Sequence, residues 1–578
     1  GNADDLAGMG EANLAMGRYA QARQFCEQAL QINPQMARAH FILGNIYREQ
    51  SAFDAAERHY AQVVQIDPGN ALAYYYRGNM LKTQGQTEMA RASYDNALSC
   101  EPGLVEAEWN RQRLLPIIFS NEEEIGEARE AYSRGLEKLE QGLNLDTAAG
   151  RRQALKGLYT STNFYLQYQG CDDLELQCKY GNIISSVMSC NYPQWSRSMA
   201  KKELPTGTRI RVGYASAFLR AHNGAVWLLG WLRHRNRERF EIFCYHTGGK
   251  IDDKTAEFKE LCDHFYHIPN DLERVCGQIV KNDLHILVYP ELGMDAQSML
   301  MAGLRLAPVQ CVGWGHPITS GLKTMDYWLS SDLMEPDDGQ EHYLEKLVRL
   351  PNMANCYSKA QHDQLQASTP KKTRKDFGLP DDSVLYFCSQ SLFKYLPQYD
   401  YLWPEIALRV PKAKFVFLAI SSIHVVKLFM ARVEKTFKKY GLDAKDYCIM
   451  MNRQTPEDYM TLNQLVDVFL DNPPWSGNNT GLAAIDAHLP IVCYPTQFMR
   501  GRHSYAILKM LGVTETIAQN EQEYIDIAVK LGTDREWRKS IVDKIAHQHE
   551  NIYEDVECVR GLESFYEKVV RASDKEFD

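Results

Sequence analysis

The sequence predicts a multidomain protein in which an all-α solenoid of short repeats precedes two α/β domains that face a cleft. Glycines and prolines each recur at 34-residue intervals near the N-terminus, at Gly10, Gly44 and Gly78 and at Pro34, Pro68 and Pro102. Beyond residue 205, short apolar runs alternate with helical patterns, which is typical of parallel sheets covered by helices. At 578 residues the chain is also too long for one compact core.

The 34-residue period indicates one helix-turn-helix unit per repeat. In the second repeat, residues 39–47 fit an amphipathic first helix and residues 53–66 fit the second, which ends at Asp67-Pro68 because proline lacks an N–H donor. The small residue Gly44 lets the first helix pack closely on its neighbour. We predict about three tetratricopeptide-type repeats over residues 1–102, with a plain helical bundle as the alternative.

Residues 103–205 keep a helical pattern but lose the repeat. One long polar helix is expected over 122–143, and two more helices over 154–188. The simplest interpretation is a helical linker or capping bundle between the repeats and the α/β part.

Two Rossmann-like domains are predicted in tandem, over residues 206–357 and 381–578, joined by a polar, lysine-rich linker at 358–380. The second domain includes the C-terminal helices. The expected strands are 210–214, 240–245, 285–289 and 309–313 in the first domain and 384–388, 414–419, 466–471 and 491–494 in the second. Ligands of such sheets bind outside the carboxyl ends of the strands, so we expect the site in the cleft between the domains.

Composition narrows the functional class. A net charge of −10 argues against a nucleic-acid partner. We find neither a signal peptide nor an apolar run long enough to span a bilayer, so no membrane partner is expected. The 14 cysteines are scattered, without CxxC pairs or Cys/His spacing typical of zinc, which favours reduced thiols and a cytoplasmic location.

The most informative loop is Asp471–Gly481, which joins a strand to a helix that begins near Thr480. Glycines and small polar residues at a helix N-terminus form an anion site, because free N–H groups and the positive end of the helix dipole face the ligand. A diphosphate would fit there. The alternative is an ordinary Asn/Thr helix cap without a ligand.

Two further loops follow strands and carry reactive side chains. Lys394, just after the strand at 384–388, could neutralise a leaving phosphate, although a loop lysine is often merely solvated. His222, after the first strand, could act as a general base or orient an acceptor, and a purely structural histidine is the alternative.

A third loop, Gly313–Gly321, is rich in glycine and hydroxyl residues and suits close contact with a sugar or phosphate, or is an ordinary Gly/Pro turn. Neither predicted sheet has GxGxxG at its first turn, and P-loop, HExxH and GxSxG motifs are absent. A dinucleotide cofactor, metal catalysis and a nucleophilic serine therefore have no support.

Together these segments resemble the O-linked N-acetylglucosamine transferases and their SPINDLY-type relatives, in which tetratricopeptide repeats are fused to a GT-B glycosyltransferase. The resemblance covers nearly the whole chain. Its motifs, each modest alone, are Arg211–Tyr214 with His222, His316–Gly321 with Asp326-Tyr327, Glu345–Leu347 with Leu350-Pro351, Gln390–Lys394, Gly477–Thr480 and Arg500–His503.

The resemblance implies inverting, metal-independent transfer of GlcNAc from UDP-GlcNAc to Ser or Thr of proteins, with no cofactor beyond the UDP-sugar donor. It assigns Lys394 to the β-phosphate and leaving UDP, and places His222 near the acceptor and the sugar. The diphosphate and nucleoside would contact Gly477, Asn478, Asn479, Thr480, Gln390 and Tyr459. The donor sugar and acceptor side would contact His316, Pro317, Thr319, Ser320, Gly321, Arg500, Arg502 and His503.

The chain departs from the animal enzymes of this family at three places. Asn478, Asn479 and Thr480 stand where those enzymes have a histidine and two threonines, and Pro456 and Tyr459 stand where they have lysine and histidine. Ala483 replaces a carboxylate near the ribose, while Asp486 lies one turn deeper on roughly the same helix face. We expect the ribose contact to be lost, moved to Asp486, or supplied elsewhere.

Alternatives remain open for donor, acceptor and activity. Relatives with this fold transfer glucose from UDP-glucose to asparagine, or fucose from GDP-fucose to serine and threonine, and pocket residues decide such choices. A repeat scaffold with a degenerate transferase is the alternative from another class. The repeats are expected to select a protein or peptide acceptor along a concave surface, and the sequence does not determine the oligomeric state.

Overall fold

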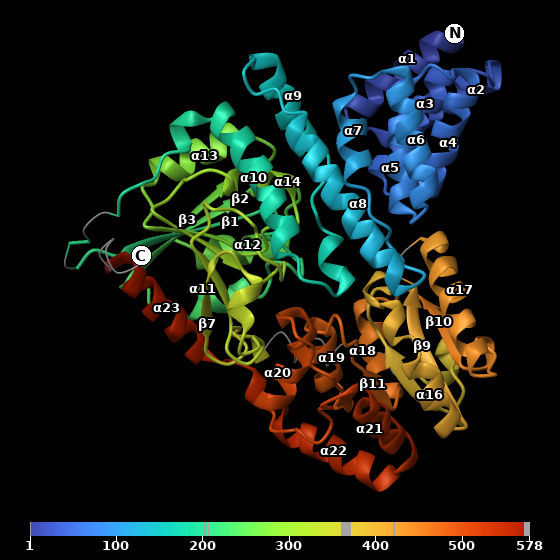
Figure 1. The fold of residues 1–578 in the computed structure, drawn as a ribbon, viewed down its shortest axis with the longest axis vertical. Helices are drawn as coiled ribbons and strands as arrows, with labels where there is room; N and C mark the ends of the chain where they lie inside the picture. The colour runs from blue at the N-terminus through green and yellow to red at the C-terminus, as the bar shows by residue number, and fades with distance from the viewer. Residues whose placement is uncertain (1, 202–203, 206, 360–371, 420–421, 572–578) are drawn as a thin grey trace. The chain divides into compact units, whose positions relative to one another are not determined.

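The computed structural model describes residues 2–201, 204–205, 207–359, 372–419 and 422–571 (Figure 1). The chain divides into two compact units, one of Gly1–Thr160 with Ser421–Met430 and one of Ser161–Ile420 with Ala431–Asp578. Most of the predicted linker, residues 360–371, lies outside the described residues. The helical segment predicted over 103–205 is divided between the units at residue 160.

The first unit begins with three antiparallel helix pairs, which confirms the tetratricopeptide-type repeats. The pairs are α1 (Ala3–Ala15) with α2 (Tyr19–Ile32), α3 (Ala37–Glu49) with α4 (Phe53–Ile66), and α5 (Ala71–Thr83) with α6 (Thr87–Cys100). Residues at equivalent repeat positions fill the space beside the periodic glycines: a Cβ atom on Gly44 would lie 2.7 Å from Tyr60, one on Gly78 would lie 2.6 Å from Tyr94, and one on Gly10 would lie 2.5 Å from the sulfur of Cys26. The 34-residue period of the glycines therefore reflects the packing of the two helices within each repeat.

Helices α7 (Val105–Gln112), α8 (Glu122–Gln141) and α9 (Ala148–Leu158) complete the first unit. The side chain of Asn121 caps α8 by accepting a hydrogen bond from the Glu124 N–H, and glutamates occupy its first turn, where the helix dipole favours negative charge. On the buried face of α8, Gly135 lies against the α7 backbone, so that a Cβ atom there would be 2.0 Å from the Gln112 carbonyl oxygen.

The second unit contains a seven-stranded parallel sheet in the order β3-β2-β1-β4-β5-β6-β7. Its strands are β1 (Ile210–Ser216), β2 (Phe240–His246), β3 (His264–His267), β4 (Ile286–Tyr289), β5 (Val309–Gly313), β6 (Tyr327–Ser331) and β7 (Lys346–Leu350). Strands β1, β2, β4 and β5 were predicted from the sequence; β3, β6 and β7 were not. Helices α11 (Leu228–His234), α12 (Asp253–Leu261), α13 (Leu272–Lys281) and α14 (Ala296–Ala302) connect strands, and α10 (Leu174–Asn191) precedes them.

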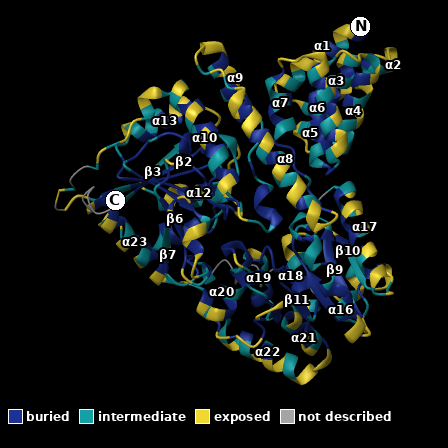
Figure 2. Ribbon diagram, viewed as in Figure 1, coloured by how far each residue is buried: buried dark blue, intermediate teal, exposed yellow. Residues whose placement is uncertain are grey.

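A second parallel sheet has the order β10-β9-β8-β11-β12. Its strands are β8 (Val384–Cys388), β9 (Ala413–Ala419), β10 (Cys448–Asn452), β11 (Val468–Leu470) and β12 (Ile491–Val492), and all except β10 were predicted. The strands at the centres of both sheets are buried (Figure 2). The helices that accompany this sheet are α16 (Leu402–Arg409), α18 (Pro456–Leu465), α19 (Asn479–Asp486), α20 (His503–Met510), α21 (Glu521–Thr533) and α22 (Arg535–Gln548). Helix α17 (Ile423–Lys439) is divided between the two units after Met430.

The last helix, α23 (Val556–Arg571), corrects the predicted domain content, because it packs on the first sheet and not on the second. Its apolar face joins the core of the first sheet through Cys558, Leu562 and Tyr566. The Tyr566 hydroxyl lies 3.0 Å from the hydroxyl of Tyr214 in β1, and both side chains are buried. The amphipathic pattern of α23 shows which face is buried but not which sheet covers it.

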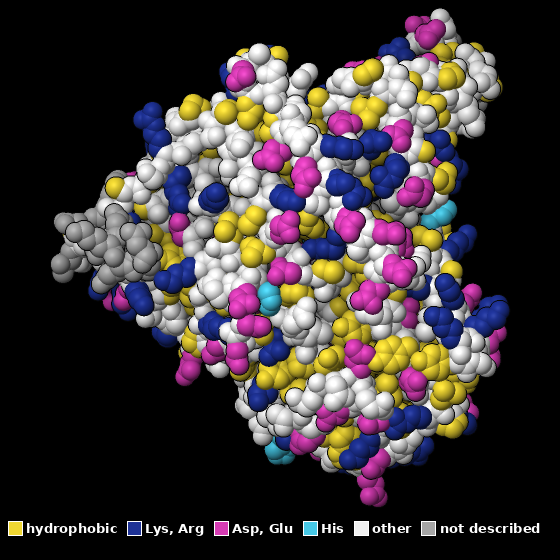
Figure 3. Space-filling model, in the orientation of Figure 1, with side chains coloured by type: hydrophobic (Ala, Val, Ile, Leu, Met, Phe, Trp, Pro, Cys, Tyr) yellow, Lys and Arg dark blue, Asp and Glu magenta, His cyan; other side chains and the backbone are white. Residues whose placement is uncertain are grey.

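The surface charge and the character of the helices bear on the expected partners. Basic and acidic side chains are interspersed on the face shown in Figure 3, without a patch of one sign that dominates it. Among the described residues, no helix has the length and the apolar character needed to cross a membrane.

Two glycines of α8 provide a test of the packing in the first unit. Gly135→Ala forces the α7 backbone away, so we expect a loss of stability of about 1–3 kcal/mol. Gly126→Ala, at an exposed position of the same helix with nothing within 4 Å, should instead raise stability by up to about 1 kcal/mol. Thermal unfolding of the full chain measures both effects, and equal effects of the two substitutions would contradict the close approach.

Candidate functional site

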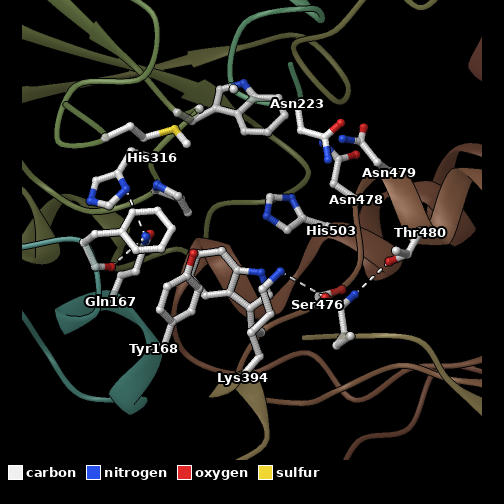
Figure 4. Close-up of a pocket in the computed structure, with 18 residues that line it drawn as sticks. Gln167, Tyr168, Asn223, His316, Lys394, Ser476, Asn478, Asn479, Thr480 and His503 are labelled. Carbon is white, nitrogen blue, oxygen red and sulfur yellow. Dashed lines mark hydrogen bonds between the residues drawn. The ribbon is translucent and has the colours of Figure 1, made fainter. Parts of the chain in front are cut away.

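A cavity of about 210 Å³ opens at the carboxyl ends of strands from both sheets (Figure 4). Strand order reverses between β1 and β4 in the first sheet and between β8 and β11 in the second, and ligands of parallel sheets bind at such switch points. The loops after β1, β5, β8 and β11 contribute Asn223, Gly224, Trp314, Gly315, His316, Pro317, Gln390, Lys394, Trp475, Ser476, Asn478, Asn479 and Thr480. The predicted location between the two α/β domains thus coincides with a cavity.

Lys394 is a partly buried lysine that lines this cavity. Its Nζ donates to Gln390 Oε1 at 3.0 Å and lies 5.0 Å from the centre of the Trp475 ring and 5.9 Å from that of Tyr168. Burial lowers the pKa of Lys394 to about 7, and the charge of Asp471 only partly offsets this effect. A bound anion would favour the charged form, so the site is suited to a ligand that brings negative charge.

The loop between β11 and α19 is held open toward Lys394 by hydrogen bonds. Asp471 accepts from the Gly477 N–H at 2.8 Å and from Ser476 Oγ at 2.6 Å, while Gln390 Nε2 donates to Thr480 Oγ1 at 2.7 Å. The side chain of Asn478, the N-cap residue of α19, makes no capping hydrogen bond. Because Asn478, Asn479 and Thr480 line the cavity, the positive end of this helix lies at the cavity.

Asn478, Asn479 and Thr480 all line the cavity, and Gly477 is adjacent. The Asn478 amide also donates to the Tyr357 hydroxyl at 3.1 Å, which holds its side chain toward the segment that follows β7. A Cβ atom at Gly477 would lie 2.3 Å from Thr480 Oγ1 and 2.8 Å from Gln390 Nε2. Glycine is thus required where the loop, the helix and Gln390 converge.

His316, in the loop after β5, provides a buried hydrogen-bond donor on the side of the cavity formed by the first α/β domain. Gln167 Nε2 donates to Phe164 O at 3.1 Å and lies 2.9 Å from His316 Nδ1, so Nδ1 accepts and Nε2 carries the ring proton. Burial lowers the pKa of His316 to about 3 and keeps the ring neutral. Within the described residues, buried Nε2 has no hydrogen-bond partner.

His503 also lines the cavity. Burial, reinforced by Lys394, lowers its pKa to about 3, and its Nδ1 lies 3.1 Å from the sulfur of Met334. Its neutral ring adds shape and a polar edge without adding charge beside Lys394.

His222 lies just outside the cavity lining, next to Asn223 and Gly224, which belong to it. The ring stacks on Phe218 with centroids 4.3 Å apart, and Nδ1 accepts the Gly224 N–H at 3.1 Å. Burial lowers the pKa of His222. Because Nδ1 accepts the Gly224 N–H, the neutral tautomer has its proton on Nε2, and the ring holds the loop after β1. Its assigned part as general base or in orienting the acceptor stays a prediction.

Several residues assigned to the donor sugar and acceptor lie elsewhere. Thr319 Oγ1 donates to Glu345 Oε2 at 2.6 Å, and the Ser320 N–H donates to Glu345 Oε1 at 2.8 Å. Gly321, with φ +68°, lies against the backbone of Gln177. The second half of the Gly313–Gly321 loop is therefore packed against other parts of the protein. Only the first half, which includes His316 and Pro317, reaches the cavity.

Four other predicted residues do not line this cavity. Arg500 is buried and pairs with Asp173 at 3.3 Å, and Arg502 lies over the Tyr505 ring. The Tyr459 hydroxyl donates to Ser389 Oγ at 3.2 Å, and Asp486 accepts a hydrogen bond from the Tyr553 hydroxyl. Their assigned contacts with donor and acceptor stay predictions, and Asp486 has a protein partner in place of a ribose.

The sequence did not predict the wall formed by Phe164, Gln167 and Tyr168, which belonged to the expected linker. Gln167 and Tyr168 belong to the short 3₁₀ helix Leu166–Gln169, and Phe164 precedes it. Tyr168 packs on Trp475 with ring centroids 4.4 Å apart. The aromatic cluster was visible in the sequence, but its place depends on tertiary packing.

The environment of Lys394 can be measured directly. We expect the ligand-free protein to show a Lys394 pKa near 7, charged and unreactive below that pH and neutral and reactive above it. Amine labelling at graded pH, read by peptide mass spectrometry, gives this pKa. Tyr168→Ala admits water beside Nζ and should move the pKa toward the ordinary lysine value. Tyr505→Ala, outside the cavity, should not; a wild-type pKa near the ordinary lysine value would refute the burial.

Comparison with curated proteins gives relatives of low identity. The probable UDP-N-acetylglucosamine–peptide N-acetylglucosaminyltransferase SEC of Arabidopsis thaliana is 24% identical over 371 residues, 62% of this chain and 37% of the relative. The probable enzyme of the same type named SPINDLY, from the same plant, is 26% identical over 338 residues, 56% and 35% of the two chains. This chain thus matches little more than a third of the length of these relatives.

The fold is shared with a solved mutant of the O-GlcNAc transferase of Thermobaculum terrenum, with a TM-score of 0.68, 21% identity and coverage of 98% and 97% of the two chains. Tetratricopeptide-repeat models match residues 13–74 and 59–92. The model of glycosyl transferase family 41 matches residues 183–367 and 353–554, more than half of the chain. With a cavity at the switch points of two parallel sheets, this match shows that the chain belongs to glycosyl transferase family 41.

Proposed function

We propose that the protein transfers a sugar from a nucleoside diphosphate sugar to serine or threonine side chains of proteins, with UDP-GlcNAc as the favoured donor. The observation that carries the proposal is the convergence of Lys394 and the N-terminus of α19 on one cavity. The family match and the printed activities of the relatives support the reaction class.

In this proposal the diphosphate lies between Lys394 and the first turn of α19. Breaking the bond to the sugar leaves negative charge on the β-phosphate, and a buried ammonium together with backbone N–H groups stabilises that charge. Gln390 bonds both Lys394 and Thr480, so it fixes the two phosphate-binding elements relative to each other. These groups supply the positive charge that a divalent cation would otherwise provide, and inversion with one displacement step follows the family.

The sugar and acceptor side is the wall formed by the first α/β domain. The Nε2–H of His316 is a buried donor suited to a sugar hydroxyl or carbonyl oxygen, and Gln167 keeps it in that tautomer. Asn223 and Gly224 line the acceptor end, where His222 fixes their loop through the Gly224 N–H. We assign no residue as general base.

The helical repeats would present protein segments to this reaction, as superhelical arrays present extended surfaces to their partners. The proposed location is the reducing cytoplasm, because the fourteen scattered cysteines of the sequence suit reduced thiols. Retention of Lys394, Gln390 and Thr480 in one hydrogen-bonded set favours an active transferase over a scaffold with a degenerate site.

Calorimetric titration with UDP, GDP and their sugar conjugates tests the donor, and transfer to a protein mixture tests the reaction. We expect UDP to bind more tightly than GDP, and Lys394→Ala to abolish transfer while circular dichroism stays unchanged. Lys509→Ala, which removes a lysine outside the cavity, is the matched control. Preference for GDP would change the donor, absence of any nucleotide binding would favour the scaffold, and near-normal turnover of Lys394→Ala would refute its role.

Ala483 lies in α19, where a carboxylate three residues beyond Thr480 would approach the ribose. We expect Ala483→Asp to strengthen UDP binding about fivefold, the effect of one added hydrogen bond. Because the Asp486 carboxylate accepts from the Tyr553 hydroxyl, Asp486→Asn should leave UDP affinity unchanged. Isothermal titration of both variants decides the matter; an Ala483→Asp protein that binds UDP no better than the wild type shows that the ribose contact is supplied elsewhere.

A further inference from the structure

Away from the cavity, three side chains of zinc-binding type converge from distant parts of the chain. His234 ends α11, Cys356 follows β7, and Glu554 precedes α23. One ligand atom from each, the imidazole nitrogen, the thiol sulfur and a carboxylate oxygen, lies within 4.8 Å of the other two. Among the described residues, this is the single group of three or more such side chains that is so arranged.

The backbone holds Glu554 in a fixed position that directs its carboxylate toward the histidine. Its N–H donates to the Tyr357 carbonyl at 2.8 Å, and its Oε1 accepts the Lys359 N–H at 3.1 Å. Glu554 adopts φ +52°, in the left-handed region that non-glycine residues rarely occupy. The remaining oxygen, Oε2, lies 3.0 Å from His234 Nε2.

An independent observation at His234 points to a ligand. Its Nε2 is buried from solvent and, among the residues that the structure describes, makes no hydrogen bond, although the Glu554 carboxylate oxygen is at ion-pair distance. Buried polar atoms in native proteins are nearly always satisfied, so an unsatisfied one calls for an explanation. The sulfur of Cys356, a residue that is 3% exposed, borders the same space. A cation between the three atoms would satisfy them together.

We propose that His234, Cys356 and Glu554 bind a Zn²⁺ ion. Thiolate, imidazole and carboxylate are the ligands that Zn²⁺ uses, whereas Mg²⁺ and Ca²⁺ prefer oxygen alone. Zn–ligand bonds of about 2.0–2.3 Å place the ligand atoms of a tetrahedral site roughly 3.4–3.7 Å apart. The His234 and Glu554 atoms, 3.0 Å apart, are slightly closer than this, so small side-chain rotations must separate them and bring in the thiolate. The Glu554 side chain is exposed, so the ion can enter from solvent and water completes the coordination.

The position of this site gives it a structural role. It joins the end of α11 to the two segments through which the chain leaves and re-enters the first α/β domain. Tyr357, between Cys356 and the linker, pairs with Tyr553 through a parallel bridge, and its hydroxyl bonds Asn478 in the cavity. Zinc would therefore hold together the two segments that contain Cys356 and Glu554, next to Tyr357. This role does not depend on the proposed transfer reaction.

Zinc titration of the reduced full chain tests this proposal without an activity measurement. The protein is stripped with a chelator, and Zn²⁺ is titrated in competition with a chromophoric chelator. We expect one high-affinity ion per chain, a thermal stabilisation on addition of Zn²⁺, and a thiolate-to-metal charge-transfer band when Co²⁺ replaces Zn²⁺. Cys356→Ser should weaken binding by at least tenfold and abolish the Co²⁺ band.

Two further variants keep the test decisive. Cys262→Ser removes another partly buried thiol elsewhere in the same domain and should leave the stoichiometry and the Co²⁺ band unchanged. Glu554→Gln can retain the bond from the Lys359 N–H, so it should fold normally yet bind Zn²⁺ more weakly, even if Cys356→Ser proves unstable. The proposal is overturned if the wild type takes up no zinc, or if Cys356→Ser and Glu554→Gln bind it as tightly as the wild type.

Discussion

The direction of the strands is the constraint on which the rest of this structure depends. All strands within each sheet are parallel, so each sheet has one edge where every strand reaches its carboxyl end. The helices that return the chain occupy the faces, which leaves the strand ends between β1 and β4 and between β8 and β11 open. Both openings contribute to one cavity, and Lys394, Thr480 and His316 reach it because each follows a strand.

The burial of titratable side chains gives this cavity its chemical character. Lys394, His316 and His503 all have lowered pKa values for the same first reason, loss of contact with water. Asp471 has the opposite shift, with a pKa raised to about 7 by burial. The unliganded site therefore holds less charge than its residue types suggest, and a charged ligand would restore part of it.

Strands could be predicted from the sequence where the local apolar pattern matches their burial in the sheet. Strands β5 and β8 were predicted with their observed ends, because continuous apolar runs identify central strands of a parallel sheet. Edge strands β3 and β10 escaped prediction, since their side chains are partly exposed and lack such a run. In the site, Lys394 and Thr480 were identified from their position after a strand, whereas Gln167 and the Thr319–Glu345 bond depend on contacts between segments far apart in the chain.

The attachment of α23 to the first sheet also governs the order in which the protein can fold during synthesis. The second α/β domain is in effect an insertion between β7 and α23. The strands of the first sheet leave the ribosome before the second α/β domain, but part of its core, including Tyr566 against Tyr214, leaves after that domain. The face of the first sheet that α23 covers stays exposed while the more than 200 residues between β7 and α23 are synthesised. Exposed apolar sheet surface is prone to aggregation during this interval. A nascent chain of this protein would therefore depend on helix α23 to complete a domain begun near residue 210.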